Sequence, residues 1–174
     1  MPVVKAGLEC YAKLGVPASK LVMAFPWYAY DYACQETAEP PPVGKEPLDW
    51  CHVTNATYYD FWQPSATANW LPNATASEML ARAIGGARWS NATSTPYFFY
   101  RSTGWDKGKI HRVDFDNPKS LAIKSAYAKG VGARGVGMWT ADLLDYGDAK
   151  LVKAMWDSFK PFSEPGAPHV AAAR

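Results

Sequence analysis

The sequence lacks the features that would assign it to several large classes of protein. No apolar run approaches the roughly 20 residues that a membrane-spanning helix needs, so we expect no membrane partner. The net charge is only +2, without a basic block or stripe, which argues against nucleic acid as a partner. The histidines share no metal-ligand spacing, so we predict no metal site and no cofactor, and we expect ordinary surface or hairpin roles for His52, His111 and His169.

The chain also lacks a signal peptide, because Met1-Pro-Val-Val-Lys5 has no charged start that leads into an apolar core and a cleavage site. Glycosylation sequons nevertheless recur in its polar middle region, and this recurrence favours passage through the secretory pathway; they begin at Asn55, Asn73 and Asn91. These two observations conflict. We therefore expect this chain to be the later part of a longer secreted protein whose own amino terminus is missing here.

Cysteine is scarce, and the total of three leaves an odd one. Cys34 and Cys51 flank a proline-rich loop and could pair in a disulfide, a bond typical of secreted proteins. Cys10 lies in a segment with a helical pattern, and the sequence assigns it no role.

Aromatic residues are abundant, at 14% of the chain. Most of these rings are expected to form a large aromatic core. Some could instead line a sugar-binding cleft, because the face of an aromatic ring offers apolar area that matches the C–H face of a pyranose.

Two apolar runs end in aromatic and acidic residues. The run from Leu21 to Phe25 shows no alternation, which is typical of a parallel strand that is buried on both faces, and it is followed by Trp27-Tyr28-Ala29-Tyr30-Asp31-Tyr32. A second run ends at Trp139 and is followed by Asp142 and Asp145. In parallel α/β folds the carboxyl ends of strands are where ligands bind, so both exits are candidate sites.

Helices and strands alternate at both ends of the chain. Apolar residues at helical spacing predict a helix over 3–14, before the strand at 20–26. Asn117 can cap a second helix before the strand at 134–139, and Asp148 can cap a last one. The order of helix, strand, helix, strand and helix is that of an α/β fold.

The segment 33–115 interrupts this order and is expected to form a small α+β unit. Thr75-Ala-Ser-Glu78 has the pattern of a capping box at the start of a helix. Residues 95–101 and 109–115 are rich in β-forming residues on either side of a glycine-containing turn, which predicts a hairpin.

Three stretches together resemble glycoside hydrolase family 18. They are Leu21-Val-Met-Ala-Phe-Pro-Trp-Tyr-Ala-Tyr-Asp-Tyr-Ala-Cys34, Asp116-Asn-Pro-Lys-Ser120, and Gly135-Val-Gly-Met-Trp139 with Leu144-Asp-Tyr146. The resemblance implies the carboxyl-terminal part of a (β/α)₈ TIM barrel, with strands 7 and 8 and their helices, and a small α+β insertion domain. It divides the chain into partial barrel (1–32), insertion domain (33–115), partial barrel (116–162) and flexible tail (163–174).

The resemblance also implies a chemistry in which this chain has no catalytic residue. Family 18 enzymes are retaining, yet the N-acetyl oxygen of the substrate attacks the anomeric carbon, while a Glu protonates the leaving oxygen. That Glu ends an Asp-x-x-Asp-x-Asp-x-Glu motif on the fourth barrel strand. The nearest pattern in this chain, Asp142-Leu-Leu-Asp-Tyr-Gly-Asp148, lacks the Glu and follows the strand at 134–139.

The residues that the resemblance assigns to substrate binding are Trp139, Tyr28, Tyr30 and Asp142. Trp139 matches the family's eighth-strand Trp, the floor under the sugar in the −1 subsite, although a ring that packs the barrel mouth would fit the same pattern. Tyr28 matches the seventh-strand Tyr near that subsite, and Tyr30 stands where many chitinases carry Arg. Asp142 and Asp31 could orient sugar hydroxyls, but solvated or capping carboxylates would look the same.

Two functions stay open for such a chain. It could be part of a lysosomal or secreted glycosidase that cleaves β-1,4-linked N-acetylglucosamine, with an N-acetylglucosamine oligosaccharide and the missing amino-terminal barrel half as its partners. It could instead be an inactive carbohydrate-binding module or a fragment without activity. An in-frame acid motif upstream of this sequence would favour the enzyme.

Overall fold

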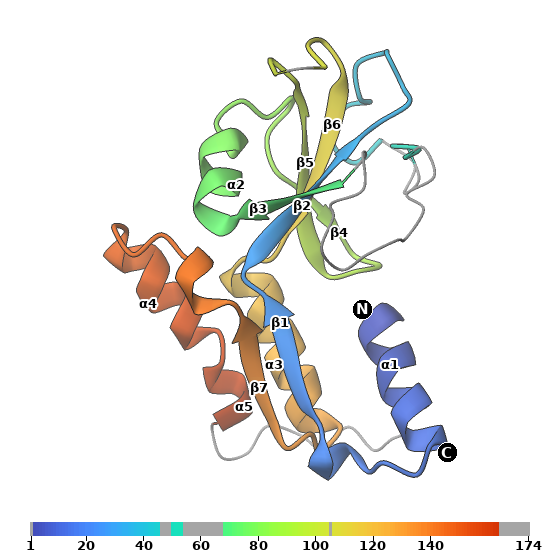
Figure 1. Cartoon of the computed structure of the whole chain (residues 1–174), viewed down its shortest axis with the longest axis vertical. Helices are drawn as coiled ribbons and strands as arrows, with labels where there is room; N and C mark the ends of the chain where they lie inside the picture. The colour runs from blue at the N-terminus through green and yellow to red at the C-terminus, as the bar shows by residue number, and fades with distance from the viewer. Residues whose placement is uncertain (1, 46–49, 54–67, 105, 164–174) are drawn as a thin grey trace.

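The computed structural model describes residues 2–45, 50–53, 68–104 and 106–163, which form two units that are stacked end to end (Figure 1). One unit is built on two parallel strands and is called the parallel unit. The other is built on an antiparallel sheet and is called the antiparallel unit. Asn55 and the predicted tail from residue 164 onward lie outside the described residues.

The parallel unit consists of β1 (Val22–Pro26) and β7 (Gly135–Trp139) with four helices. The strands pair in register, from Val22 with Gly135 to Pro26 with Trp139. Helix α3 (Pro118–Gly130) lies against the pair, with α4 (Ala149–Asp157) and α5 (Lys160–Ser163) to one side and α1 (Pro2–Lys13) to the other (Figure 1). Short 3₁₀ turns, η1 (Ala18–Lys20) and η2 (Ala141–Leu143), precede β1 and follow β7.

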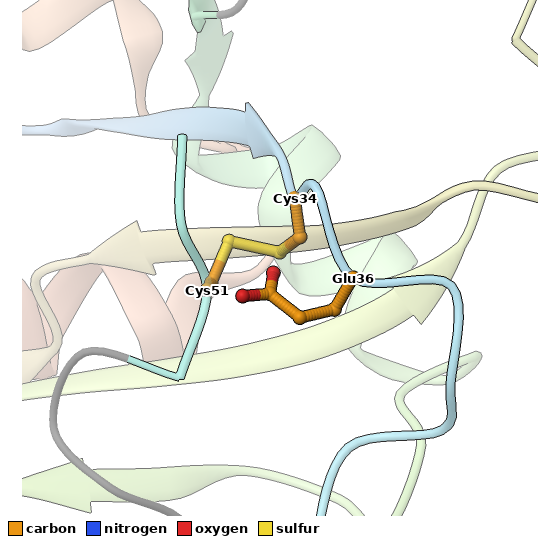
Figure 2. A group of neighbouring side chains, drawn as sticks. All are labelled: Cys34, Glu36 and Cys51. Carbon is orange, nitrogen blue, oxygen red and sulfur yellow. A yellow bond between two sulfur atoms is a disulfide. The ribbon is translucent and has the colours of Figure 1, made fainter. Parts of the chain in front are cut away.

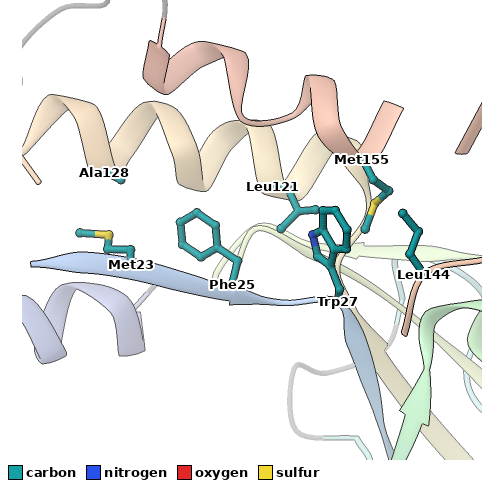
Figure 3. Packing of buried hydrophobic residues seen from close by; sticks show 7 residues of the cluster. All are labelled: Met23, Phe25, Trp27, Leu121, Ala128, Leu144 and Met155. Carbon is teal, nitrogen blue, oxygen red and sulfur yellow. The ribbon is translucent and has the colours of Figure 1, made fainter. Parts of the chain in front are cut away.

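The core of the parallel unit lies between the strands and the helices. Met23, Phe25 and Trp27 point from one face of β1 toward α3 (Figure 3). Trp27 is fully buried, with its ring centroid 5.1 Å from that of Trp156 and 6.0 Å from that of Phe159. This agrees with a packing role for Trp27, and burial of so large a ring is a main source of stability for the unit.

The opposite face of the strand pair is uncovered. Val22 is 61% exposed and Ala24 is exposed too, because no described segment of the chain packs against that side of β1. The prediction from sequence was a strand that is buried on both faces. In the described residues only the face that carries Met23 and Phe25 is covered.

The antiparallel unit is a five-stranded sheet with one helix. The strand order is β3-β2-β6-β5-β4. The strands are β2 (Tyr28–Ala33), β3 (Ala68–Pro72), β4 (Arg88–Ser90), β5 (Thr95–Arg101) and β6 (Ile110–Phe115). The hairpin predicted from sequence is present as β5 and β6, and α2 (Asn73–Leu80) covers one face through Ala76, Met79 and Leu80.

The change from one sheet to the other comes early in the chain. Strand β2 follows β1 after a single residue, Trp27, yet β2 pairs with β3 and β6 in the antiparallel sheet. The sequence-based division placed this change after residue 32. The tyrosines of β2 are therefore part of the antiparallel sheet and not of the end of β1.

Helix termini follow the local sequence signals in part. The Asn117 side chain accepts from the Ser120 N–H at 2.9 Å, and Asp148 accepts from two N–H groups of α4, so both predicted caps are confirmed. Helix α2 begins at Asn73, two residues before the predicted cap at Thr75. Pro161 lies in the first turn of α5, where a missing N–H costs nothing.

Helix α3 departs from its apolar pattern because of a buried ion pair. Ile123, an apolar residue of this helix, is 37% exposed. Lys124 is buried in its place, and its Nζ lies 2.6 and 2.7 Å from the two carboxylate oxygens of Asp116. Asp116 sits at the junction between β6 and α3, so this pair ties the helix to the end of the antiparallel sheet.

In the part of the chain that the structure describes, no helix combines the length and apolarity that crossing a bilayer requires.

Candidate functional site

Trp139 lies at the carboxyl end of β7, beside the point where β1 passes into β2. The Trp27 N–H donates to the Trp139 carbonyl oxygen at 3.0 Å, which extends the pairing of β1 and β7 by one bond. The Trp139–Thr140 peptide bond is cis. The Trp139 side chain is 57% exposed, on the uncovered face of the parallel unit. A large indole held on a rigid strand end offers a sugar an apolar surface of fixed position.

The segment after Trp139 brings carboxylate and phenol groups to the same strand end. The Thr140 hydroxyl donates to the Asp142 carboxylate, which is exposed. The Tyr146 hydroxyl donates to the Ala141 carbonyl oxygen at 2.8 Å, and its ring is exposed. Asp142 thus has one partner within its own turn and retains acceptor capacity for an external hydroxyl.

The tyrosines of β2 form a second aromatic surface. Tyr28, Tyr30 and Tyr32 alternate along the strand, so all three lie on one face of the antiparallel sheet. The ring centroids of Tyr28 and Tyr30 are 5.3 Å apart, and those of Tyr30 and Tyr32 are 5.8 Å apart. Tyr30 is 36% exposed. Because β2 begins directly after Trp27, this row starts next to the strand end that carries Trp139.

An ion pair borders the tyrosine row. Arg112 contacts Asp114 through two hydrogen bonds of 2.8 and 2.9 Å, and its guanidinium lies 4.3 Å from the centroid of the Tyr97 ring. Burial, and then the negative charge of Asp114, raises the pKa of Tyr32 to about 12. The Tyr32 hydroxyl therefore keeps its proton at neutral pH and can act as a hydrogen-bond donor.

Asp31 does not belong to this surface. It points to the opposite face of β2 and is buried, with Oδ2 accepting from the Tyr100 hydroxyl at 2.8 Å and Oδ1 lying 2.9 Å from His111 Nδ1. The suggestion that Asp31 orients sugar hydroxyls is wrong, because its two oxygens are used inside the sheet. A carboxylate between two tyrosines of an alternating strand was the signal that it faces the other way.

His111 lies in β6 of the predicted hairpin, but it is not the ordinary residue that the sequence suggested, because it is buried. It is only 4% exposed, and its Nε2 lies 2.6 Å from the Asp106 carboxylate. Burial lowers the pKa of the imidazole, but the hydrogen bonds and charges of Asp31 and Asp106 outweigh burial and raise that pKa above its ordinary value. The sequence holds no direct signal for this cluster, because Asp31 and His111 are 80 residues apart.

Cys34 and Cys51 form a disulfide, the pairing that the sequence left open, and Cys10 is free and exposed. Figure 2 shows the Glu36 carboxylate next to this bond, and the potential ligand atoms of Cys34, Glu36 and Cys51 lie within 4.8 Å of one another. Both sulfur atoms are used in the disulfide, and Glu36 contacts His52. A metal ion would need free thiolates here, so the group does not constitute a metal site in this form.

Of the sequon asparagines, Asn91 is the one whose side-chain environment the structure describes. It is exposed in the turn between β4 and β5. Asn73 begins α2, and its side chain lies outside the described part, as does all of Asn55.

Comparison with known proteins places these features in a family. The model of glycosyl hydrolases family 18 matches residues 3–143. Di-N-acetylchitobiase of Mus musculus is 33% identical over 155 residues, which are 87% of this chain and 39% of the mouse protein. The human protein of the same name is 31% identical over 159 residues, with 89% of this chain and 38% of that protein covered. The chain thus spans about two fifths of the length of these relatives.

Solved structures show the same fold relationship. The crystal structure of chitinase ChiW from Paenibacillus sp. str. FPU-7 superposes with a TM-score of 0.62 at 24% identity, and the match covers 90% of this chain and 16% of that one. A chitinase from Rhizomucor miehei gives a TM-score of 0.56 at 25% identity, with 87% of this chain and 42% of that chain covered. The family match extends over most of the chain and includes both strands of the parallel unit, and on this evidence the chain belongs to glycosyl hydrolases family 18.

Proposed function

We propose that this chain supplies the sugar-binding end of a family 18 glycosidase whose whole protein hydrolyses β-1,4-linked N-acetylglucosamine by substrate-assisted retaining catalysis. In this proposal β1 and β7 are the seventh and eighth strands of a (β/α)₈ barrel, and the antiparallel unit is its insertion domain. The similarity to di-N-acetylchitobiases supports the substrate class. The uncovered face of β1 supports the barrel, because that face would be its interior.

The observation that carries the proposal is the position of Trp139. The Trp139 indole has 57% of its surface exposed and lies at the carboxyl end of a parallel strand. Barrel enzymes bind their substrates at that end. In the proposal Trp139 is the floor under the −1 sugar, Tyr28 and Tyr30 form its side wall, and Asp142 accepts a hydrogen bond from a sugar hydroxyl.

The catalytic acid is proposed to lie outside these 174 residues, since the sequence contains no Asp-x-x-Asp-x-Asp-x-Glu motif. The same fact favours a second candidate, a carbohydrate-binding module that does not hydrolyse its ligand. The two differ in one measurement. A complete protein that contains this chain and the acid motif releases N-acetylglucosamine from chitobiose, whereas a binding module leaves chitobiose intact.

Binding is tested by titrating chitotriose into the protein and its Trp139→Ala variant, with isothermal calorimetry as the readout. Loss of the indole face is expected to weaken binding about tenfold, which corresponds to about 1.4 kcal/mol. Trp156→Phe is the matched control, because Trp156 is also partly exposed but lies on α4 and packs on Trp27. Equal affinities for the wild type and the Trp139→Ala variant would contradict the assignment.

Passage through the secretory pathway to the lysosome or the cell exterior is part of the same proposal. The Cys34–Cys51 disulfide supports an oxidising compartment, and the exposure of Asn91 supports glycan attachment at its sequon. Glycopeptide mass spectrometry of the protein from a eukaryotic host should show a glycan on Asn91. Complete absence of the modification at this position would remove that support.

A further inference from the structure

A buried polar cluster lies inside the antiparallel unit, on the sheet face away from the tyrosine row. His111 of β6 occupies its centre. Its Nδ1 lies 2.9 Å from Asp31 Oδ1 on β2, and its Nε2 lies 2.6 Å from Asp106 Oδ2 in the turn between β5 and β6. The side chains of these three residues are each at most 6% exposed. The cluster therefore joins two strands and a turn through one imidazole ring.

The geometry specifies the charge of that ring. A neutral imidazole has one N–H and one nitrogen lone pair, so one of its nitrogens would turn a lone pair toward a carboxylate. An imidazolium has an N–H on both nitrogens and can donate to both Asp31 and Asp106. In a buried site an unmatched lone pair costs considerably more than at the surface, and this favours the protonated form.

The other groups around the cluster complete the hydrogen bonding of the two carboxylates. The Tyr100 hydroxyl of β5 lies 3.3 Å from His111 Nδ1, but it donates to Asp31 Oδ2 at the shorter distance of 2.8 Å. Burial together with the charge of Asp31 raises the Tyr100 pKa, so this donor keeps its proton. The Ser102 hydroxyl donates to Asp106. Burial raises the Asp106 pKa, but the Ser102 and His111 hydrogen bonds outweigh burial and lower it. Arg82, in the turn that follows α2, opposes the shift at Tyr100, because its positive charge lowers the Tyr100 pKa.

We propose that His111 is a protonated clamp that makes the antiparallel unit most stable in mildly acidic solution and loosens this unit as the pH rises. This proposal concerns a conformational device of the sheet and does not depend on the sugar-binding role. It does have a consequence for that role. Strand β2 carries Asp31 on one face and Tyr28 and Tyr30 on the other, so loss of the clamp would free the strand that presents those tyrosines.

The direction in which stability changes with pH follows from the shifted pKa values of His111 and Asp106. A raised His111 pKa stabilises the fold fully below the ordinary histidine pKa of about 6.5, and the stabilisation is lost as the pH rises through the raised value. A lowered Asp106 pKa stabilises the fold above the ordinary aspartate pKa of about 3.9, and the stabilisation is lost as the pH falls through the lowered value. Both contributions are complete between about pH 4 and pH 6.5.

The first test measures the ring directly in the wild-type chain. Histidine side-chain ¹⁵N NMR at pH 7.5 is expected to show both ring nitrogens of His111 protonated. His52 provides a comparison within the same chain, since its ring contacts Glu36 and its side chain is 63% exposed. A His111 ring with one protonated nitrogen at pH 7.5 would overturn the proposal.

The second test measures unfolding in urea at pH 6 and at pH 9. The equilibrium constant between folded and unfolded wild-type chain is expected to fall with rising pH, by at most about tenfold per pH unit for the one proton involved. His111→Gln should lose this component, and His52→Gln should keep it. Should His111→Gln fail to fold, Asp106→Asn serves in its place, because it removes one carboxylate and should shift the pH dependence toward neutral pH. If the stability of His111→Gln and of Asp106→Asn depended on pH as that of the wild type does, the clamp would be refuted.

Discussion

The two units of the molecule differ in how completely the residues of their strands are buried. In the antiparallel unit Phe98, Phe99 and Val113 are fully buried, and α2, the disulfide and the His111 cluster close the sheet from several directions. In the parallel unit every residue of β7 is at least partly exposed, and Val22 of β1 is 61% exposed. The first unit contains its own core, whereas the second covers only one face of its strand pair.

This difference agrees with what parallel and antiparallel sheets require. An antiparallel sheet can leave one face to solvent, while parallel strands are stable when both faces and both edges are covered. The strands β1 and β7 pair only with each other among the described residues. Further strands on their outer edges are what the proposed barrel would add.

The largest expected effect comes from Trp27, which anchors the core of the parallel unit. Trp27→Ala should lower the free energy of unfolding by about 3–5 kcal/mol, because it opens a cavity between Phe159 and Trp156. Urea unfolding followed by tryptophan fluorescence measures this loss. The comparison is sharpened by following His111 NMR signals in the same variant, which should stay close to those of the wild type.

Trp27→Phe is the matched control for the cavity. It keeps most of the ring volume and removes an indole N–H that has no hydrogen-bond partner among the described residues. Its cost should be clearly smaller than that of Trp27→Ala. An equal loss in the two variants would mean that something other than the cavity sets the effect.

The second effect concerns the antiparallel unit. Replacing Cys34 and Cys51 by alanine removes a crosslink between residues 17 positions apart, which should cost about 3 kcal/mol through the larger freedom of the unfolded chain. Thermal unfolding under non-reducing conditions measures the loss. Cys10→Ser should leave stability unchanged, because Cys10 is free and exposed. If the double variant is as stable as the wild type, the disulfide does not contribute to the closure of this unit.

Local signals in the sequence predicted the local structure well. The β5–β6 hairpin and the caps at Asn117 and Asp148 are present, because each depends on residues that are neighbours in the chain. The sheet to which β2 belongs could not be predicted from residues that are neighbours in the chain. Its partners begin 35 or more residues later, and an aromatic strand directly after Pro26 looks the same in either sheet.

The same distinction between local and distant partners applies to the candidate site. The aromatic exits of the two apolar runs pointed to Trp139 and the β2 tyrosines, of which Trp139 and Tyr30 are exposed. The partners of Asp31 and Lys124 were missed, since both are charged residues that are buried only because another segment brings an opposite charge. Single-sequence patterns predict burial from hydrophobicity, so paired buried charges escape them.

Hydrogen–deuterium exchange of the backbone amides, measured on the full chain by mass spectrometry, tests the contrast between the two units most directly. Peptides from β5 and β6 should exchange at least about a hundredfold more slowly than peptides from β1 and β7, since local opening of the less covered unit costs less free energy. Equal protection of the four strands would contradict this account, because the parallel unit would then be as self-sufficient as the antiparallel one.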